Sequence, residues 1–353
     1  MSPTLIDRLP KAELHIHVEG SIEPDMVLAL AERNGLDFPH KSKAGLLATY
    51  EFANLAGFSA VYASNSCALR TERDFYDLTY SYMRRVREDN VIHAEIAFAP
   101  QGASHRNVAP EIALEGVLAA MDDAKAAFGM TGGVIIGCQR HRGAEAGLNM
   151  LRRMKPYRDR IMALGLASLE VGHPPRLFLR VFEEARDLGW KTVAHAGEEG
   201  PPEYIWEALD ILKVDRIDHG VRCEEDPRLV RRLAEEQVPL TVCPLSNIYL
   251  KVFPALREHN IARLLRAGLL VTVNSDDPPY FGGYVNANYA ACRDVLDLSD
   301  EEIIQLGRNS FIASFLPEEQ KCNYLARIDR IVGAAPEASG MKDVAPIGSG
   351  DRA

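Results

Sequence analysis

Two histidines near the start of the sequence have the spacing of metal ligands in a β-strand. His15 and His17 lie in the segment ELHIHV, 13–18. Alternate residues of an extended strand point to the same face, so both imidazoles would face one way and could chelate a metal ion. A His-x-His pair also arises by accident or as a hydrogen-bonded pair in a core. The pair alone therefore leaves the metal hypothesis open.

Other residues of metal-binding type follow further apolar segments. His195 closes the segment KTVAHA and His219 ends the segment RIDH. Asp276 and Asp277 come after LLVTVN and one serine. Three imidazoles and a carboxylate, without a thiolate, suit a borderline ion such as Zn²⁺ with one position open for water. Adjacent residues of an extended chain diverge, so one aspartate would bind the metal and the other would face a substrate.

A further carboxylate has two interpretations. Glu198 stands three residues after His195 in HAGEEG, on the loop that would leave a strand. It could act as a general acid, or it could be a carboxylate at the start of a helix, where the helix dipole favours negative charge. Its position in the sequence supports both equally.

Eight short apolar segments would position these side chains. Longer stretches with helical periodicity and many charges separate them, and this alternation is typical of βα units. The predicted strands are 13–18, 91–99, 132–138, 161–167, 191–196, 216–219, 238–243 and 269–274. Eight parallel strands close a (β/α)8 TIM barrel, in which all strands end at one mouth. The sequence therefore predicts an α/β barrel with the polar residues gathered at that mouth.

The connection from 20 to 90 is too long for one crossover helix. We expect extra helices there that cover the C-terminal mouth, and the aromatic stretch 50–82 is a candidate lid. The predicted barrel domain is 1–332. The segment 333–353, rich in Gly, Ala, Pro and Ser, is expected to be a loose tail.

Composition and charge exclude several classes of protein. Of the 353 residues, 47% are hydrophobic and 25% are charged, as in globular proteins and unlike disordered or fibrous chains. A formal net charge of -10 argues against nucleic acid or an anionic membrane as partner and favours a small molecule. The sequence shows no Cys-x-x-Cys pair, secretion signal or long apolar run, so we expect reduced thiols and a cytoplasmic location.

Five motifs, in order along the chain, resemble the adenosine and adenine deaminases. They are ELHIHVEGS at 13–21, HAGEE at 195–199, IDHG at 217–220, CPLSN at 243–247 and NSDDP at 274–278. The resemblance extends over about 9–330. That family consists of zinc-dependent (β/α)8 barrels of the amidohydrolase superfamily, which is the fold that the strand count predicts.

The resemblance also implies an activity and a role for each site residue. One zinc ion would be held by His15, His17, His195 and Asp276. Glu198 would protonate ring nitrogen N1, His219 would orient and help to deprotonate the attacking water, and Asp277 would hydrogen-bond to ring N7. The implied reaction is hydrolytic deamination of a 6-aminopurine to a 6-oxopurine, with release of ammonia.

Details of the motifs are most similar to the adenine deaminase branch. Adenosine-specific members usually have an aspartate in a His-x-Asp-Gly setting, where it contacts ribose, whereas this chain has Glu19 in HVEG. Glu19, the segment 170–175 that contains Gly172, and the segment 280–284 resemble the branch that acts on the free base. Glu19 and Gly172 are therefore expected to contact the substrate, adenine or a modified adenine.

Two departures from that branch lie at the predicted mouth. Ala99 stands where an aspartate is expected. Ala167, Ser168 and Leu169 stand where the branch has Asp-Ser-Ser before its glutamate. The changes either have no consequence or adapt the pocket to a modified purine.

Alternative functions remain at this stage. They are a deaminase of adenosine or another 6-aminopurine nucleoside, another mononuclear amidohydrolase, and a purine-binding protein without activity. The predicted fourth strand contains no lysine of the kind that bridges two zinc ions in binuclear relatives, which favours the mononuclear deaminase. The oligomeric state is open, and a homodimer is one possibility.

Overall fold

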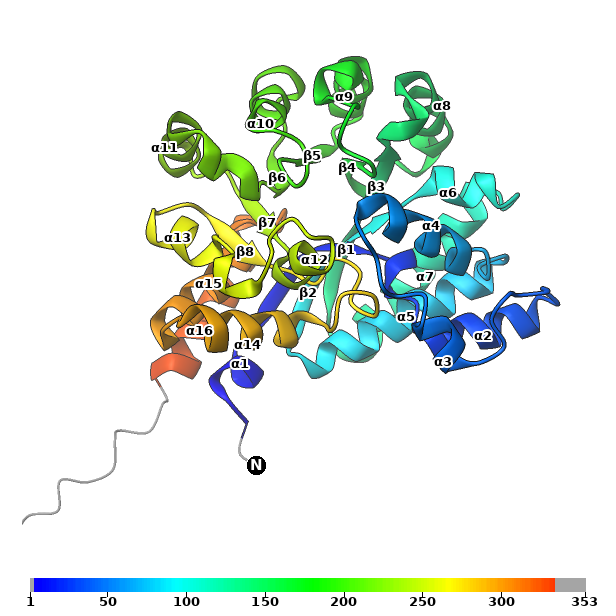
Figure 1. Ribbon diagram of the computed structural model, residues 1–353, viewed down its shortest axis with the longest axis horizontal. Coiled ribbons are helices and arrows are strands. Elements are labelled where there is room, and N and C mark those ends of the chain that lie inside the picture. Colours follow the sequence, from blue (N-terminus) through cyan, green and yellow to red (C-terminus); the bar gives the residue numbers. More distant parts are fainter. Residues whose placement is uncertain (1–2, 334–353) are drawn as a thin grey trace, which may run out of the picture.

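The computed structural model describes residues 3–333, which form a single parallel barrel. Its strands are β1 (Lys11–His17), β2 (Val91–Phe98), β3 (Thr131–Gln139), β4 (Ile161–Ala167), β5 (Lys191–Ala196), β6 (Arg216–His219), β7 (Leu240–Val242) and β8 (Val271–Val273). Neighbouring strands in the sheet are neighbours in the sequence, and Figure 1 shows them at the centre of the molecule. The predicted (β/α)8 TIM barrel is confirmed.

Helices surround the strands. The α-helices are α1 (Leu5–Arg8), α2 (Pro24–Arg33), α3 (Lys43–Leu47), α4 (Leu55–Ser66), α5 (Glu72–Glu88), α6 (Pro100–His105), α7 (Pro110–Phe128), α8 (Ala144–Met154), α9 (Leu179–Asp187), α10 (Pro202–Glu207), α11 (Pro227–Glu236), α12 (Pro244–Tyr249), α13 (Ile261–Arg266), α14 (Val285–Leu296), α15 (Asp300–Ile312) and α16 (Glu318–Gly333). Short helical turns are η1 (Glu19–Ser21), η2 (Arg140–Arg142), η3 (Lys155–Tyr157), η4 (Pro175–Phe178), η5 (Ala208–Leu212), η6 (Val221–Glu225) and η7 (Leu256–Glu258). Several helices begin at proline, which suits the first turn because its missing N–H has no partner there.

The strands that are bounded most differently from the prediction are β7 and β8. The predicted segments 238–243 and 269–274 are each reduced to three residues. Pro239 precedes β7 and cannot donate a backbone hydrogen bond, which shortens that strand. After β8, the N–H of Asn274 still donates to the carbonyl of Val242 in β7, and its side chain makes further hydrogen bonds with Leu14 and Thr272. The predicted bounds of β4, β5 and β6 agree with the structure.

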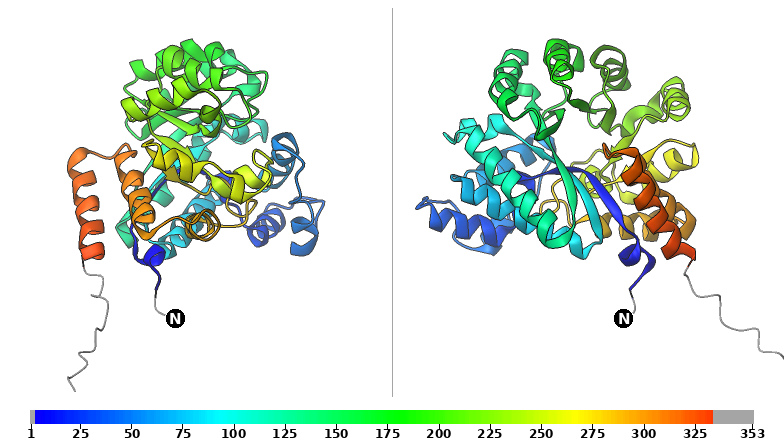
Figure 2. Two further views of the ribbon diagram at one scale, coloured as in Figure 1. Left: turned by 60° about the vertical axis from the view of Figure 1, so that its left-hand side comes forward. Right: turned by 180° about the vertical axis from the view of Figure 1, so that it is seen from behind.

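The long connection after β1 contains α2 to α5. Figure 1 shows α2, α3 and α4, in blue, as a group at one side of the barrel, and Figure 2 shows α16 on the side away from them. The predicted lid stretch 50–82 divides between two helices. Leu55 and Phe58 of α4 line the cavity at the mouth, whereas α5 packs against α7 on the outside of the barrel.

Two further expectations concern the chain as a whole. All six cysteines are free. Among the helices of 3–333, none is long and apolar enough to span a membrane. The predicted tail, 333–353, lies outside the described residues except for Gly333, the last residue of α16.

The barrel closes between its first and last strands through very few backbone bonds. A single bridge joins Ile16 to Asp276, just after β8. The N–H of His17 donates to the carbonyl of Asp276 over 3.1 Å, and the N–H of Asp276 donates to the carbonyl of His15 over 3.1 Å. The seam therefore contains three of the predicted metal ligands.

Side chains complete the rest of this seam. The N–H of Leu14 donates to Oδ1 of Asn274 over 2.9 Å, and the N–H of Ala12 donates to the hydroxyl of Ser310 over 2.9 Å. Both backbone groups are buried, so without these acceptors their hydrogen bonds would be lost. Polar side chains thus replace the missing strand ladder.

We predict that Asn274→Ala lowers the free energy of unfolding by about 1–3 kcal/mol, because the buried N–H of Leu14 loses its acceptor. Denaturant unfolding would measure the change. Asn149→Ala is the control, since the Asn149 side chain makes only an exposed contact with Arg152. Equal stability of the Asn274 variant and the unmodified protein would contradict this account of the seam.

Candidate active site

A cavity of about 460 Å³ opens at the carboxyl-terminal mouth of the barrel. Its polar wall consists of His17, Glu19, His195, Glu198, His219, Asp276 and Asp277, together with neighbouring basic and amide groups. Much of the remaining wall is apolar or small and includes Leu55, Phe58, Ala99, Ala167 and Leu169. The structure therefore brings distant sequence motifs to one cavity.

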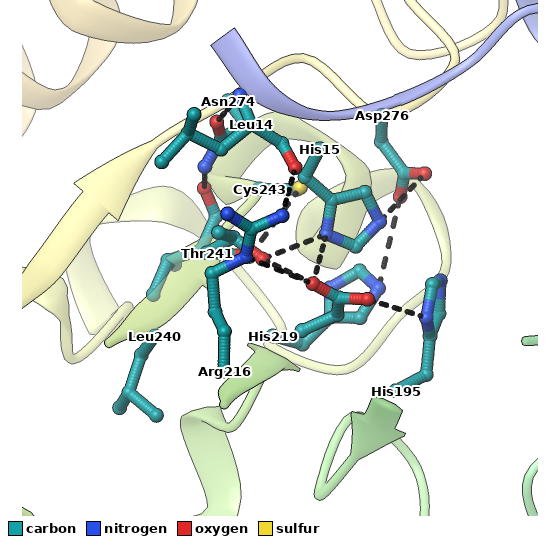
Figure 3. A network of polar contacts seen from close by, with 12 residues as sticks. Leu14, His15, His195, Arg216, His219, Leu240, Thr241, Cys243, Asn274 and Asp276 are labelled. Carbon is teal, nitrogen blue, oxygen red and sulfur yellow. Dashed lines mark hydrogen bonds and ion pairs between the residues drawn. The ribbon is translucent and has the colours of Figure 1, made fainter. Parts of the chain in front are cut away.

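Four predicted metal ligands meet at one point. Nε2 of His17 lies 3.3 Å from Nε2 of His195 and 3.5 Å from Oδ1 of Asp276. Nε2 of His15 lies 3.5 Å from the same carboxylate oxygen, and Figure 3 shows His15, His195 and Asp276 converging. Ligands about 2.0–2.1 Å from a tetrahedral zinc ion stand roughly 3.3–3.4 Å from one another. Donor atoms of His15, His17 and His195 lie within 4.8 Å of one another, and Asp276 forms a second such group with His15 and His219, so the structure offers a candidate metal site.

The protonation states of His17 and Asp276 suit a cation, whereas burial of His15 is outweighed by the charges of Asp218 and Asp276, which raise its pKa. Nε2 of His15 is buried without a hydrogen-bond partner. Burial lowers the pKa of His17 to about 3, so its imidazole is neutral at pH 7. Burial alone would raise the pKa of Asp276, but the surrounding histidines outweigh it and hold that pKa well below its usual range. Neutral imidazole and ionised carboxylate are the forms that bind metals.

Asp218 and Thr241 fix the orientation of two of these imidazoles. The Thr241 hydroxyl donates to Oδ1 of Asp218 over 2.8 Å, and its oxygen lies 3.1 Å from Nδ1 of His15. Oδ2 of Asp218 lies 3.3 Å from Nδ1 of His195. The contact of Nδ1 with Thr241 leaves Nε2 of His15 to face the candidate metal position, whereas Nδ1 of His195 has only the ion-pair contact with Asp218 and no hydrogen bond.

Sequence reasoning missed Asp218 because it is adjacent to His219. Strand alternation predicts that neighbours point to opposite faces. His219, however, has a φ of 62°, and Asp276 likewise has a φ of 63°. These left-handed residues end the alternation, so Asp218 and His219 both reach the cluster. Such conformations are uncommon outside glycine and collect at functional sites.

Glu198 and His219 form an acid–base pair beside the cluster. Nε2 of His219 lies 3.6 Å from Oε2 of Glu198, and Oε1 of Glu198 has no partner. Burial, with the nearby charge of Asp276, raises the pKa of Glu198 well above its usual value, so this carboxyl retains a proton. Burial lowers the pKa of His219 well below its usual value. The pair therefore offers a protonated acid and a neutral base.

Asp277 faces the cavity from a different direction than Asp276. Its Oδ1 is buried without a partner, and burial with the charge of Asp276 raises its pKa well above the usual value. A Cβ at Gly20 would lie 1.5 Å from this oxygen, so only glycine fits there. The glycine in ELHIHVEGS thus makes room for Asp277.

Arg106 also lines the cavity, and no motif in the sequence predicts its presence there. Its Nη2 lies 3.8 Å from Oε1 of Glu19, and both side chains are buried. Burial raises the pKa of Glu19, and Arg106 opposes this effect. Both carboxylate oxygens of Glu19 and two nitrogens of Arg106 have no hydrogen-bond partner. This end of the cavity therefore offers both a donor and an acceptor to a ligand.

Gly172 is a predicted site residue that the structure brings neither to the cavity wall nor to the cluster of histidines and aspartates. It is exposed, has a φ of 85°, and is absent from the residues that line the wall. The two sequence departures do reach the wall, through Ala99 and through the run Ala167, Ser168 and Leu169.

Known proteins resemble this chain along nearly its whole length. A sequence model described as adenosine deaminase matches residues 10–331. A protein named adenine deaminase from Hahella chejuensis is 53% identical over 322 residues, covering 91% of this chain and 96% of that protein. Another from Acinetobacter baylyi is 52% identical over 327 residues, covering 93% and 98%. The crystal structure of adenine deaminase from Arthrobacter aurescens superposes with a TM-score of 0.91 at 43% identity, covering 92% and 99%.

We predict that Asp218→Asn weakens binding of a divalent metal by roughly 10–100-fold, because asparagine cannot accept from both the threonine and the imidazole. Competition against a chelator would measure the affinity. Asp159→Asn is the control, since Asp159 is an exposed residue and the change of charge is the same. Unchanged affinity in the Asp218 variant would refute the orienting role.

Proposed function

This chain belongs to the adenosine deaminase family, and we propose that it hydrolyses free adenine to hypoxanthine and ammonia. The observation that carries the proposal is the joint placement of a metal-type cluster, the protonated Glu198 and the buried Glu19 in one cavity. Relatives about half identical in sequence carry the name adenine deaminase. A cytoplasmic location is proposed from the sequence alone.

We propose that the metal is a single Zn²⁺ ion. Its ligands would be His15, His17, His195 and Asp276. Three imidazoles and one carboxylate, without thiolates, are a donor set that suits zinc. When bound, the ion supplies a water of lowered pKa, and so a hydroxide nucleophile near neutral pH.

Glu198 and His219 would move the protons of the reaction. C6 of adenine is a weak electrophile, and protonation of N1 makes it open to attack. Glu198 holds a proton, is buried at the cavity wall and has a free carboxyl oxygen, so it suits the role of proton donor to N1. His219 is neutral and would accept the proton of the attacking water. A proton returned to the amino group lets it leave as ammonia.

Asp277 would orient the purine ring. Ring nitrogen N7 of adenine carries no proton, so a partner must donate to it. The raised pKa of Asp277 keeps a proton on its carboxyl, whose Oδ1 is otherwise unpartnered. A protonated Asp277 and a protonated Glu198 thus present two donors to two ring nitrogens.

Glu19 favours the free base over the nucleoside. The free base carries an N–H at N9, which an unpartnered carboxylate oxygen can accept, whereas a nucleoside has ribose at that position. Nη2 of Arg106 lies 3.8 Å from Oε1 of Glu19, and its charge opposes the burial that raises the pKa of Glu19. A ribose would have to displace this buried pair, or leave it without partners.

The size of the cavity favours a second candidate substrate. At the packing density of protein interiors, adenine would fill roughly a third of its 460 Å³. Ala99, Ala167 and Leu169 make part of the remaining wall small and apolar. An adenine with an apolar substituent would bury that substituent against this wall.

We predict that Glu198→Gln keeps one zinc ion per chain and loses about 10²-fold or more in kcat, the range of general acid catalysis. The amide preserves the size of the side chain and cannot deliver the proton. Elemental analysis would measure zinc, and ammonia release would measure turnover. Near-normal turnover would mean that another group is the acid.

We predict that kcat/KM is about 10²-fold or more higher for adenine than for adenosine, because ribose would leave buried polar groups unpaired. Ammonia release from adenine, adenosine and adenines substituted at N6 or C2 would measure the preference. Glu19→Asp, whose side chain is one methylene shorter, should reduce the ratio of kcat/KM for adenine to kcat/KM for adenosine. Adenosine turned over as well as every free base would overturn the choice of substrate, while leaving the proposed zinc ligands and Glu198 untouched.

A further inference from the structure

A single buried carboxylate holds the loop that carries Glu198. Glu170 lies shortly after β4 and is fully buried. It accepts four consecutive backbone N–H groups, those of Gly197 (2.6 Å), Glu198 (3.0 Å), Glu199 (2.8 Å) and Gly200 (2.8 Å). Hydrogen bonds to an ionised acceptor are about twice as strong as neutral ones, so this loop is firmly fixed to the end of β4.

The glycines in HAGEEG fit this arrangement. Gly197 has a φ of 74°, a left-handed conformation that lets the loop turn its N–H groups toward one point. A Cβ at Gly200 would lie 2.6 Å from Oε1 of Glu170, so only glycine permits the close approach of the loop. The sequence of the loop is therefore shaped by the carboxylate that it surrounds.

Arg140 ties the loops after β3, β4 and β5 together. It is fully buried and belongs to η2, just after β3. Its guanidinium donates to the carbonyl of His195 and, over 3.4 Å, to the carbonyl of His173. The N–H of His173 in turn donates to the carbonyl of Glu170 over 3.1 Å. Glu170 is thus itself held in a fixed place.

We propose that Glu170 is a positioning residue for the proton donor, holding the loop so that the Glu198 carboxyl faces the substrate. This inference rests on the proposed function, in which Glu198 protonates N1. Oε1 of Glu198 has no partner, and its Oε2 has only the 3.6 Å contact with His219. The direction of the side chain therefore depends on the backbone that Glu170 holds.

The negative charge of Glu170 also favours proton donation by Glu198, because it helps to raise the pKa of the Glu198 carboxyl. Burial and Asp276 are the larger causes of the raised pKa of Glu198, and the negative charge of Glu170 adds to them. A fixed anion behind the loop thus favours the protonated form of the acid. Geometry and charge both assist proton delivery.

The test is Glu170→Gln, combined with Glu198→Gln. The amide has one acceptor oxygen, and its NH₂ group would face backbone N–H groups. We expect kcat for adenine to fall by roughly 10–100-fold, as when groups that orient active-site ligands are removed, with little change in KM or zinc content. In the Glu198→Gln background, Glu170→Gln should lower kcat no further, because residues that act as a unit are not additive.

Glu199→Gln is the matched control. It changes a carboxylate of the same loop whose side chain accepts none of the four N–H groups, so activity should stay at the unmodified level. Normal kcat in Glu170→Gln, or an equal loss of kcat with and without the Glu198 carboxyl, would overturn the proposal. The second result would mean that Glu170 serves only the stability of the barrel.

Two further measurements cover the remaining outcomes. If Glu170→Gln does not fold, Gly200→Ala can be used instead, because it disturbs the same contact. We expect Gly200→Ala to lower kcat only when Glu198 is present. An unchanged kcat in this variant would overturn the proposal. Hydrogen exchange at the amides of 197–200 needs no substrate. Faster exchange in the Glu170 variant would show that Glu170 holds the loop, even if adenine proves not to be the substrate. Unchanged exchange would overturn the proposal.

Discussion

Besides Glu170, five buried carboxyl groups lie at the mouth of this barrel, and the balance of their charges governs the rest of the site. They are Glu19, Glu198, Asp218, Asp276 and Asp277. An isolated buried charge costs several kcal/mol, so each group needs either a cationic partner or a proton. Histidines keep Asp218 and Asp276 ionised, whereas Glu198 and Asp277 are pushed toward their protonated forms. The same electrostatic requirement therefore places a candidate cation site beside two carboxyl groups that favour their protonated forms.

The adjacent residues Asp276 and Asp277 differ in protonation state because their side chains face different surroundings. Asp276 has a left-handed backbone and turns its carboxylate to the imidazoles, whereas Asp277 turns into the cavity beside Gly20. The ionised state of Asp276 favours the protonated state of Asp277, because the negative charge of Asp276 adds to burial in raising the pKa of Asp277. The loops after β3, β4 and β5 add mechanical support on the opposite wall, through Arg140 and Glu170. The cavity is thus fixed on both sides by buried polar contacts.

Much of this arrangement could be predicted from sequence. Apolar segments predicted the eight strands, and residues at strand ends predicted the cluster of histidines and aspartates, because parallel strands place their carboxyl ends together. Contacts between side chains on different sides of the barrel could not be predicted, because the spacing of residues in the sequence does not show which of them meet in the fold. Arg106 reaches Glu19 from the end of α6, and Thr241 reaches His15 from β7. Gly172 was predicted to contact the substrate because its segment resembles the adenine deaminase branch, but it does not line the cavity. Similarity of a segment therefore does not ensure that each of its residues reaches the site.

The seam between β1 and β8 has a consequence for how the protein is made. It joins the first strand to the last, so Leu14 and Asn274, 260 residues apart, must meet before the barrel is complete. Contacts of such long range form late, because the intervening chain must first be ordered. A nascent chain that has emerged only as far as β7 contains His15, His17 and His195 but lacks Asp276 and the backbone bonds that close the ring. Completion of the barrel, and of the candidate metal site at its seam, therefore follows synthesis of the last strand.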